Sequence, residues 1–211
     1  MTHILDVAEA VFAKHGYGVP LNDVAKAAGV APALMRYYFG DKEQLFRAVF
    51  FRRGPELNAM RLATLDAYAA AAGDHPTLEG FIDAFVRTGF EQIQLNEGHR
   101  NYGAIIAYVN SSRGAINQLM SETFDAVSDR LIEEMRRLFP DTPLEDIYWG
   151  YHFLTGAFTF SLGQTGRIDV ISGGLCRSDD FKAISERLAP TMAAGLKALF
   201  ESRKAQRAAS E

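Results

Sequence analysis

The sequence has little cysteine, few histidines and no long apolar run. Cys176 is the only cysteine among 211 residues, and the five histidines show no ligand spacing. This excludes a disulfide within the chain and a multi-cysteine zinc site, and it favours a reducing compartment. No apolar run approaches the roughly 18 residues of a membrane-spanning helix. Asp6 and Glu9 lie where a signal peptide would be basic and then apolar. We expect a cytoplasmic protein with no metal, no cofactor and no membrane contact.

Motifs that mark enzyme sites are missing as well. The chain has no Gly-x-Ser-x-Gly, no phosphate-binding loop, no His-Glu-x-x-His and no Glu-x-x-His pair for a di-iron bundle. The acidic pairs at 145–146 and 179–180 lie at expected helix starts, where capping and the helix dipole account for them. We therefore predict no catalytic residues and no enzyme.

What the chain does contain is helical periodicity throughout. Hydrophobic residues make up 48% of the sequence and charged residues 23%, the balance of an ordinary globular protein. Apolar residues recur at steps of three and four without sustained alternation, which predicts amphipathic helices and no strands. The expected helical segments are residues 4–12, 21–28, 32–39, 41–53, 78–93, 119–138, 144–163 and 179–200. Gly54 and Pro55 are expected to end the fourth helix.

The net charge of −4 hides an asymmetry along the chain. Residues 1–54 hold seven lysines and arginines against five acidic residues, while the remainder holds 15 against 21. A net charge of +2 followed by −6 is typical of a small DNA-binding unit carried by a body that does not touch DNA. An excess of two charges over 54 residues can also arise by chance.

The second and third predicted helices have the pattern of a helix-turn-helix. They meet across Gly29 and Val30, Ala25 is small where the helices pack closest, and Gly29 lies where the backbone needs a positive φ. Pro32 suits the first position of a helix. The positions expected to bury apolar surface are Val24, Ala28, Val30, Met35 and Tyr38, with Phe39 as the alternative to Tyr38.

The opposite face of the third helix has the chemistry of a recognition surface. Arg36 can donate two hydrogen bonds to guanine, Pro32 and Ala33 offer apolar contact to thymine methyls, and Tyr37 and Lys42 can reach phosphates. The residues predicted to contact DNA are Lys26, Ala31, Pro32, Ala33, Arg36, Tyr37, Tyr38 and Lys42. The alternative is that Arg36 is an ordinary solvated residue and that the tyrosines belong to the core.

The segments ILDVAEAVFAKHGY and LNDVAKAAGVAPALMRYYFGDKEQLFRAVF resemble the N-terminal domain of the TetR family of transcriptional regulators. The shared features are the hydrophobic pattern, the AGV turn, the aromatic run ending in Phe-Gly, and the Lys-Glu after it. PLEDIYWGYHFLTGAF and GLCRSDDFKAISERLAPTMAAGLKAL resemble, less distinctively, a C-terminal domain type of some members. The resemblance implies homodimers that bind palindromic operators, usually as repressors, and release them when a small molecule enters the C-terminal domain.

The sequence departs from the family pattern in the DNA-binding region. Family members commonly have serine or threonine before the second and third helices, where this chain has Val19, Pro20 and Ala31. A lost cap costs about 0.5–2 kcal/mol where nothing replaces it. Family members often have tyrosine at the position of Arg36. Many also have an arginine-rich arm before the first helix, which is expected to be absent here. In this chain the turn at Gly18 is about one residue shorter than in the family pattern.

The body carries the expected dimer and ligand functions. In the family the last two long helices pair with their copies, and residues 144–163 and 179–200 contain small residues that allow close helix approach. Packing within one chain explains those small residues equally well. A pocket is predicted from aromatic residues with polar handles, although each is individually typical of a core. The predicted lining residues are Phe85, Tyr102, Tyr108, Phe124, Trp149, His152 and Phe153.

Together these features predict an all-α protein with an N-terminal three-helix helix-turn-helix DNA-binding domain at 1–48 and a larger helical ligand-binding and dimerisation domain at 49–211. The expected function is a ligand-responsive, sequence-specific transcriptional regulator, a homodimeric repressor released from double-stranded operator DNA by a small apolar or aromatic effector. The alternative is a helical small-molecule-binding or interaction protein with no DNA role.

Overall fold

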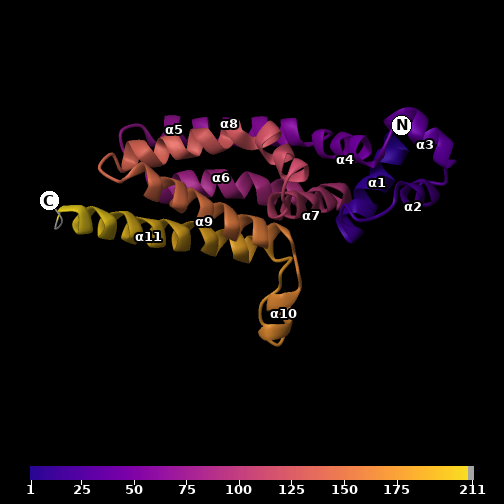
Figure 1. Ribbon diagram of the computed structural model, residues 1–211. Helices are drawn as coiled ribbons and strands as arrows, with labels where there is room; N and C mark the ends of the chain where they lie inside the picture. The colour runs from indigo at the N-terminus through magenta and orange to yellow at the C-terminus, as the bar shows by residue number, and fades with distance from the viewer. Residues whose placement is uncertain (209–211) are drawn as a thin grey trace. The chain divides into compact units, whose positions relative to one another are not determined.

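A computed structural model describes residues 1–208, which form helices and no strand (Figure 1). The all-α fold predicted from the sequence is therefore confirmed. The helices are α1 Thr2–His15, α2 Leu21–Ala27, α3 Pro32–Phe39, α4 Lys42–Phe51, α5 Gly54–Ala72, α6 Leu78–Ile93, α7 Glu97–Ser111, α8 Ala115–Leu138, α9 Leu144–Leu162, α10 Arg167–Ile171 and α11 Phe181–Ala208. Within this part of the chain no helix combines the length and hydropathy needed to cross a bilayer.

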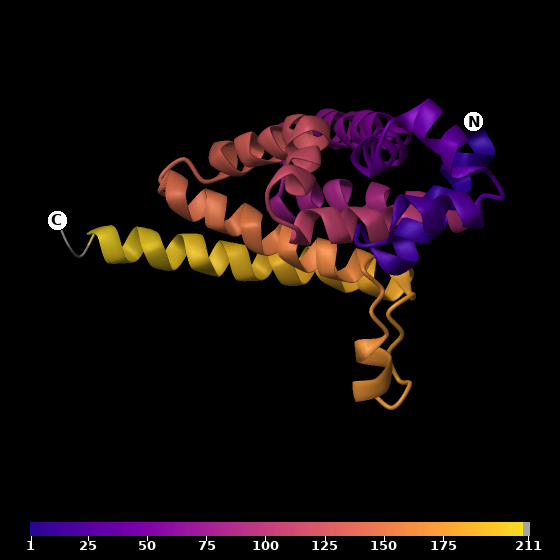
Figure 2. The ribbon, with the colours of Figure 1, turned by 45° about the vertical axis from the view of Figure 1, so that its right-hand side comes forward.

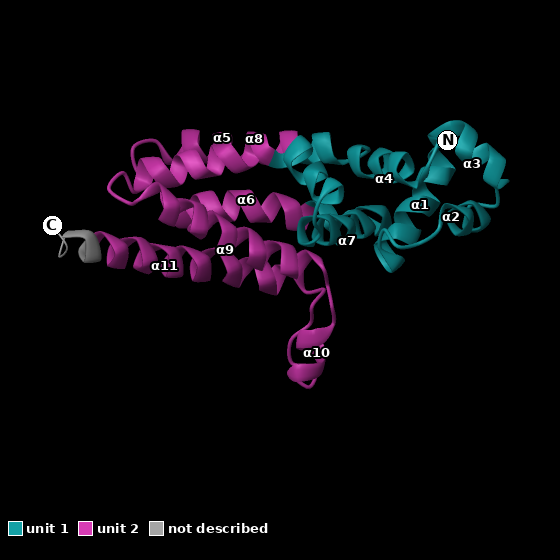
Figure 3. Cartoon of the chain, in the orientation of Figure 1, with its two compact units in different colours: residues 1–57, 92–124 teal, residues 58–91, 125–211 magenta. Residues whose placement is uncertain are grey.

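The chain divides into two compact units (Figure 3). Unit 1 comprises residues 1–57 and 92–124, and unit 2 comprises residues 58–91 and 125–211. Unit 1 thus joins the four N-terminal helices to α7 and the first part of α8. The division into functional domains after residue 48 stays a prediction about which residues bind DNA.

Unit 1 is organised around α1, which packs against α2, α4 and α7. The ring of Phe12 meets that of Phe46 edge-on, with 5.0 Å between their centroids. Beside this core the carboxylate of Glu9, only 1% exposed, accepts hydrogen bonds from Nε and Nη2 of Arg53 at 2.9 and 3.2 Å. A Cβ at Gly98 would lie 2.6 Å from the Arg53 guanidinium, so the absence of a side chain there leaves room for the ion pair.

Unit 2 is built on the pairing of α9 with α11, which lie side by side in Figures 1 and 2. A Cβ at Gly150 would lie 2.8 Å from the Phe200 ring, so the glycine allows the two helices to approach closely. Phe90 of α6 packs against Phe158 of α9 and Phe181 of α11, with ring centroids 5.1 and 5.6 Å away. The Arg203 Nε also donates to Asp146 at 3.1 Å.

Most of the predicted helices are confirmed close to their expected bounds. Of the acidic pairs at expected helix starts, Asp180 accepts from the Ala183 backbone N–H at 3.0 Å, whereas the pair at 145–146 makes no side-chain cap at α9. Asp41 accepts a hydrogen bond from the Gln44 backbone N–H at 2.9 Å and so caps α4. The expectation that Gly54 ends the fourth helix is wrong, because α4 ends at Phe51 and Gly54 begins α5. The sequence pattern also missed α5, α7 and α10.

Candidate functional site

The corner between α2 and α3 is closed by backbone hydrogen bonds around Gly29. Gly29 has φ 67°, its N–H donates to the Lys26 carbonyl at 3.1 Å, and the Val30 N–H donates to the Ala25 carbonyl at 3.0 Å. This is a Schellman ending, in which a left-handed residue lets the chain turn sharply while the last helical carbonyls stay bonded. The positive φ predicted for Gly29 is confirmed, and the geometry fixes the angle at which α3 leaves α2.

The inward face of α3 consists of Met35 and Phe39, both buried. The expectation that Tyr38 faces inward is wrong, because Tyr38 is 46% exposed. At 3.6 residues per turn, a step of four residues ends about 40° from its start and a step of three about 60°. Phe39 therefore follows Met35 into the core more directly than Tyr38 does, and Tyr38 joins the outward surface.

The outward face of α3 is open along its length. Ala31, Pro32, Ala33 and Arg36 are exposed, and Tyr37 is 81% exposed. Arg36 carries the only charge of this helix. Its Nη2 donates to Oδ1 of Asn22 on α2 at 3.2 Å, which holds the guanidinium across the corner between the two helices. The sequence reasoning missed Asn22, although an exposed amide on α2 facing an arginine 14 positions later is a signal that could have been used.

Two lysines flank this surface. Lys26 is exposed on the last turn of α2, and Lys42 begins α4. The Lys42 Nζ lies 4.2 Å from the centroid of the Tyr17 ring, a cation–π contact that limits where the ammonium can go. Burial, together with the nearby carboxylates of Glu43 and Asp41, raises the pKa of Tyr17, so its hydroxyl stays protonated. Tyr17 is a second residue that the sequence reasoning missed.

Of the aromatic residues predicted to line a pocket, Phe85 lies inside unit 2. Its ring is 5.9 Å from that of Phe158 and lies 3.9 Å from the guanidinium carbon of Arg61. Arg61 is itself buried, and its Nε donates to the Phe85 carbonyl at 3.1 Å. Burial lowers the pKa of Arg61 to about 10, which still leaves it charged at neutral pH. A buried arginine between aromatic rings is a feature that the pocket prediction missed.

Tyr102, Tyr108 and Phe124 lie in unit 1, which also contains the helix-turn-helix. The rings of Tyr102 and Phe124 lie 5.7 and 6.2 Å from that of Phe50. Tyr108 packs against Phe46, 6.5 Å away. The structure therefore divides the predicted pocket residues between the two units, and these three belong to the packing of α4 against α7 and α8.

Trp149, His152 and Phe153 lie on the exposed side of α9. The expectation that they face the enclosed centre of the body is therefore corrected, since Trp149 and Phe153 are each 50% exposed. The rings of Trp149 and Phe153 stack with 5.9 Å between their centroids. Together with three further residues of α9 and α11 they line a surface hollow of about 350 Å³. The other lining residues are Asp146, Leu199 and Arg203. We call this surface the aromatic hollow.

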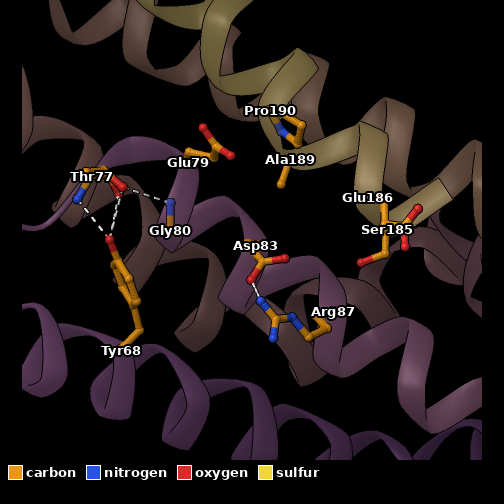
Figure 4. A pocket seen from close by; sticks show the side chains of 10 residues that line it. All are labelled: Tyr68, Thr77, Glu79, Gly80, Asp83, Arg87, Ser185, Glu186, Ala189 and Pro190. Carbon is orange, nitrogen blue, oxygen red and sulfur yellow. Dashed lines mark hydrogen bonds and ion pairs between the residues drawn. The ribbon is translucent and has the colours of Figure 1, made fainter. Parts of the chain in front are cut away.

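A second recess in unit 2, of about 400 Å³, opens between α6 and α11 (Figure 4). None of the predicted pocket residues lines it. The lining residues are Tyr68, Thr77, Glu79, Gly80, Asp83, Arg87, Ser185, Glu186, Ala189 and Pro190. The Tyr68 hydroxyl accepts from the Thr77 backbone N–H at 2.9 Å, and Asp83 pairs with Arg87. Among the side chains that the structure describes, residues 1–204, no group of three or more is placed to hold a metal ion.

Comparison with protein families now identifies the chain. The family described as "Bacterial regulatory proteins, tetR family" matches residues 4–49, and the one described as "Tetracyclin repressor-like, C-terminal domain" matches residues 83–195. The second match alone covers more than half of the 211 residues. The chain belongs to the TetR family. It is therefore a transcriptional regulator with a helix-turn-helix DNA-binding domain, as the sequence resemblance predicted.

Individual relatives of this TetR-family chain are distant. The HTH-type transcriptional regulatory protein RaaS of Mycobacterium tuberculosis is 39% identical over 62 residues, which are 29% of each protein. The fatty acid degradation regulator FadR of Bacillus halodurans is 18% identical, covers 89% of this chain and 97% of its own, and has a TM-score of 0.53. FadR of Bacillus subtilis, solved in complex with stearoyl-CoA, is 16% identical, with 92% and 98% covered and a TM-score of 0.58. The two structural likenesses show the shared fold.

Proposed function

We propose that this TetR-family regulator binds a palindromic operator as a homodimer, represses transcription there, and leaves the operator when a small apolar or aromatic effector binds its body. The observation that carries the proposal is the exposed face of α3, with Arg36 tethered by Asn22 on a closed helix-turn-helix. Because it would act on chromosomal DNA, we place the protein in the cytoplasm.

Base reading is assigned to Arg36. Its guanidinium has five N–H donors, and the bond to Asn22 uses one of them. A bidentate contact to guanine is worth about 1–3 kcal/mol against a wrong base. Thymine methyls can be contacted by the neighbouring Ala31, Pro32 and Ala33. Tyr37 and Tyr38 are the proposed contacts to the sugar-phosphate backbone of the DNA. Lys26, Lys42 and the first amides of α4 are the proposed phosphate contacts, which position the helix without reading sequence.

The homodimer is supported by the exposed faces of α9 and α11. Phe160 of α9 is exposed, although aromatic residues of this size usually lie buried or at interfaces. Gly156 and Gly195 are also exposed, and a Cβ at either position would meet nothing within 4 Å. Open glycines on exposed helix faces allow a partner helix to approach closely. A two-fold dimer would present two copies of α3 to two half-sites.

The effector is proposed to bind the helical body and to act through coupling with the DNA site. Of the aromatic residues named from the sequence, Phe85 is buried in the interior of unit 2 and stays the predicted contact. FadR of Bacillus subtilis shows that a protein of this fold can hold a long apolar chain, since it was solved with stearoyl-CoA. If the effector lowers operator affinity by a given factor, the operator must lower effector affinity by the same factor.

The decisive experiment starts by footprinting the protein on the DNA upstream of its own gene. Fluorescence anisotropy then measures the affinity of the protein for the sequence that the footprint shows to be protected. Arg36→Ala should lose the preference for the cognate site over a scrambled duplex by at least about tenfold. Arg136→Ala, which removes an exposed arginine of α8, is the matched control and should change nothing. Full selectivity in the Arg36→Ala variant would contradict base reading by this residue, and no sequence preference in the wild type would contradict the function.

The effector is tested separately with stearoyl-CoA and with salicylate as probes of the acyl and aromatic classes. The expected result is a probe that raises the melting temperature of the protein and displaces labelled operator. Binding of both probes with no change in operator affinity would argue for the ligand-carrying alternative.

A further inference from the structure

The segment 163–180 connects α9 to α11 and contains α10. In Figures 1 and 2 this segment projects from α9 and α11, with α10 at its tip. We call this segment the arm. Its tip holds four exposed apolar residues, among which Val170 is 82% and Leu175 88% exposed. The other two are Ile168 and Ile171. An apolar cluster this open on a projecting segment marks an interaction surface.

The arm is held in shape by its own hydrogen bonds. Asp169 accepts from the Ser178 backbone N–H at 2.9 Å, and Ser178 Oγ accepts from the Gly166 N–H at 3.2 Å, so the two sides of the arm are joined. At the tip, Ser172 Oγ accepts from the Cys176 N–H at 2.9 Å. The tip residues therefore do not need to be ordered on binding, which lowers the entropic cost of association.

The charge of the arm selects the kind of surface that it fits. Between residues 168 and 176 the only charged side chain is Asp169, which bonds to the arm's own backbone. Arg177, just beyond, pairs with Asp179 at 2.9 Å. Arg167, exposed where α10 begins, is the one basic residue beside the tip. Phosphate backbones and anionic lipid surfaces are bound through several lysines and arginines together, and a single arginine is no such cluster. A mainly aliphatic tip suits an apolar protein surface.

Such a surface exists in the same unit, along the first half of α9. The aromatic hollow of about 350 Å³ presents Trp149 and Phe153 together with Leu199. It carries a polar edge where Arg203 bonds to Asp146. Its aromatic walls match an aliphatic tip, and Trp149 and Phe153 lie 14 and 10 residues before the arm begins at Gly163.

A two-fold axis through α9 would bring the base of one copy's arm beside the aromatic hollow of the other. If the α9 helices of two copies pack antiparallel with the axis at the open Gly156, residue 149 of one copy faces residue 163 of the other. Both lie seven residues, or about 10 Å, from the axis along the helix. In an isologous interface each copy gives and receives the same contact. We propose that the arm of each copy docks its apolar tip in the aromatic hollow of the second copy, an inference that rests on the proposed homodimer.

The sequence supplies one probe on each side of this contact, since Trp149 is the only tryptophan and Cys176 the only cysteine. One preparation carries Cys176→Ser and keeps Trp149, and the other carries Trp149→Phe with a dansyl group on Cys176. When the two are mixed and allowed to exchange subunits, energy transfer from tryptophan to dansyl can occur only between copies. Transfer that appears on mixing is the expected result, and mixed dimers without transfer would overturn the docking.

Substitutions at the tip give a second test by sedimentation velocity. Val170→Ser and Leu175→Ser together should weaken dimerisation at least tenfold, and combined with Phe153→Ser they should lose less than the sum of the separate effects. Leu95→Ser removes an exposed leucine of unit 1 and should leave dimerisation unchanged. A wild-type chain that stays monomeric would contradict the homodimer itself. Dimers that ignore the tip substitutions would contradict only the arm, and tip-dependent binding to phosphatidylcholine vesicles in such dimers would assign the tip to a membrane instead.

Discussion

At the scale of single residues, Gly29 decides whether the DNA-binding corner can form. Its φ of 67° is costly for any residue with a Cβ, by about 1–2 kcal/mol, although no atom stands in the way of the added methyl. Gly29→Ala should therefore lower the free energy of unfolding by about that amount, measured by urea denaturation. Gly18→Ala is the matched control, because Gly18 also meets no neighbour but has no positive φ. Equal losses in both variants would show that the left-handed backbone is not the cause.

The buried pair of Glu9 and Arg53 should matter far more than the exposed pair beside it. Glu9→Gln leaves the Arg53 charge without its carboxylate and should lower the free energy of unfolding by about 3 kcal/mol. This is the low end of the cost of breaking a buried ion pair, because the Arg53 side chain is 20% exposed. Asp6→Asn breaks the more exposed pair with Arg52 and should cost under about 1 kcal/mol. Both are measured by urea denaturation at pH 7, and similar costs would contradict the burial argument.

At the scale of helices, α8 carries a pH-dependent contribution to stability. Burial by itself would raise the pKa of Glu134, but hydrogen bonds and charge from Arg130 and Arg137 on the same helix outweigh it and lower the pKa below 4.5. A carboxyl whose pKa is lower when folded stabilises the protein above its unfolded pKa, and this contribution is lost as pH falls through the folded pKa. Glu134→Gln should thus destabilise the protein at pH 7, and the loss should shrink progressively as pH falls below 4.5. A penalty that is independent of pH would rule out the charge as its source.

The helices also show what a sequence pattern can and cannot predict. The corner at Gly29 and the cap at Asp41 were predictable because each depends on one residue with a local conformational preference. α5 was missed because alanines spread around it blur the apolar stripe, and α10 because five residues are too short for periodicity to be seen. The choice between Tyr38 and Phe39 depended on packing against another helix, which adjacent aromatic residues in the sequence do not reveal.

The candidate sites likewise contain residues that the sequence alone could predict and residues that only the fold reveals. Arg36 was predictable as an outward cation from helical phase alone, whereas its tether to Asn22 depends on the crossing of two helices. The pocket prediction chose aromatic residues with polar handles, and this chemistry fits exposed surfaces as well as cavities. Trp149 and Phe153 illustrate the difficulty, because the property that suggested a ligand also suits an interface with a partner. Only the fold assigns α9 an outer face.

At the scale of the whole molecule, the charge distribution favours DNA contact at one end of the sequence. Residues 1–54 carry a net charge of +2 and the remainder −6, so contacts between the acidic remainder and a phosphate backbone would be repulsive. Operator affinity should therefore depend on few basic residues per copy. When the logarithm of operator affinity is plotted against the logarithm of salt concentration, the slope should be shallow for DNA with a single half-site. The slope should be about twice as steep for DNA with two half-sites.

Two recognition helices held by one dimer should read the spacing of the operator as well as its sequence. Helix-turn-helix dimers contact half-sites on one face of the duplex, about one helical turn of 10–10.5 base pairs apart. Inserting five base pairs between the half-sites turns the second half-site to the opposite face, so that one dimer can no longer reach both. Operator affinity, measured by fluorescence anisotropy, should fall by at least about 100-fold and approach that of an isolated half-site, because the advantage of linked binding is lost. Affinity that does not change with the insertion would mean that the two copies of α3 bind DNA independently, and the homodimer would then have no part in operator recognition.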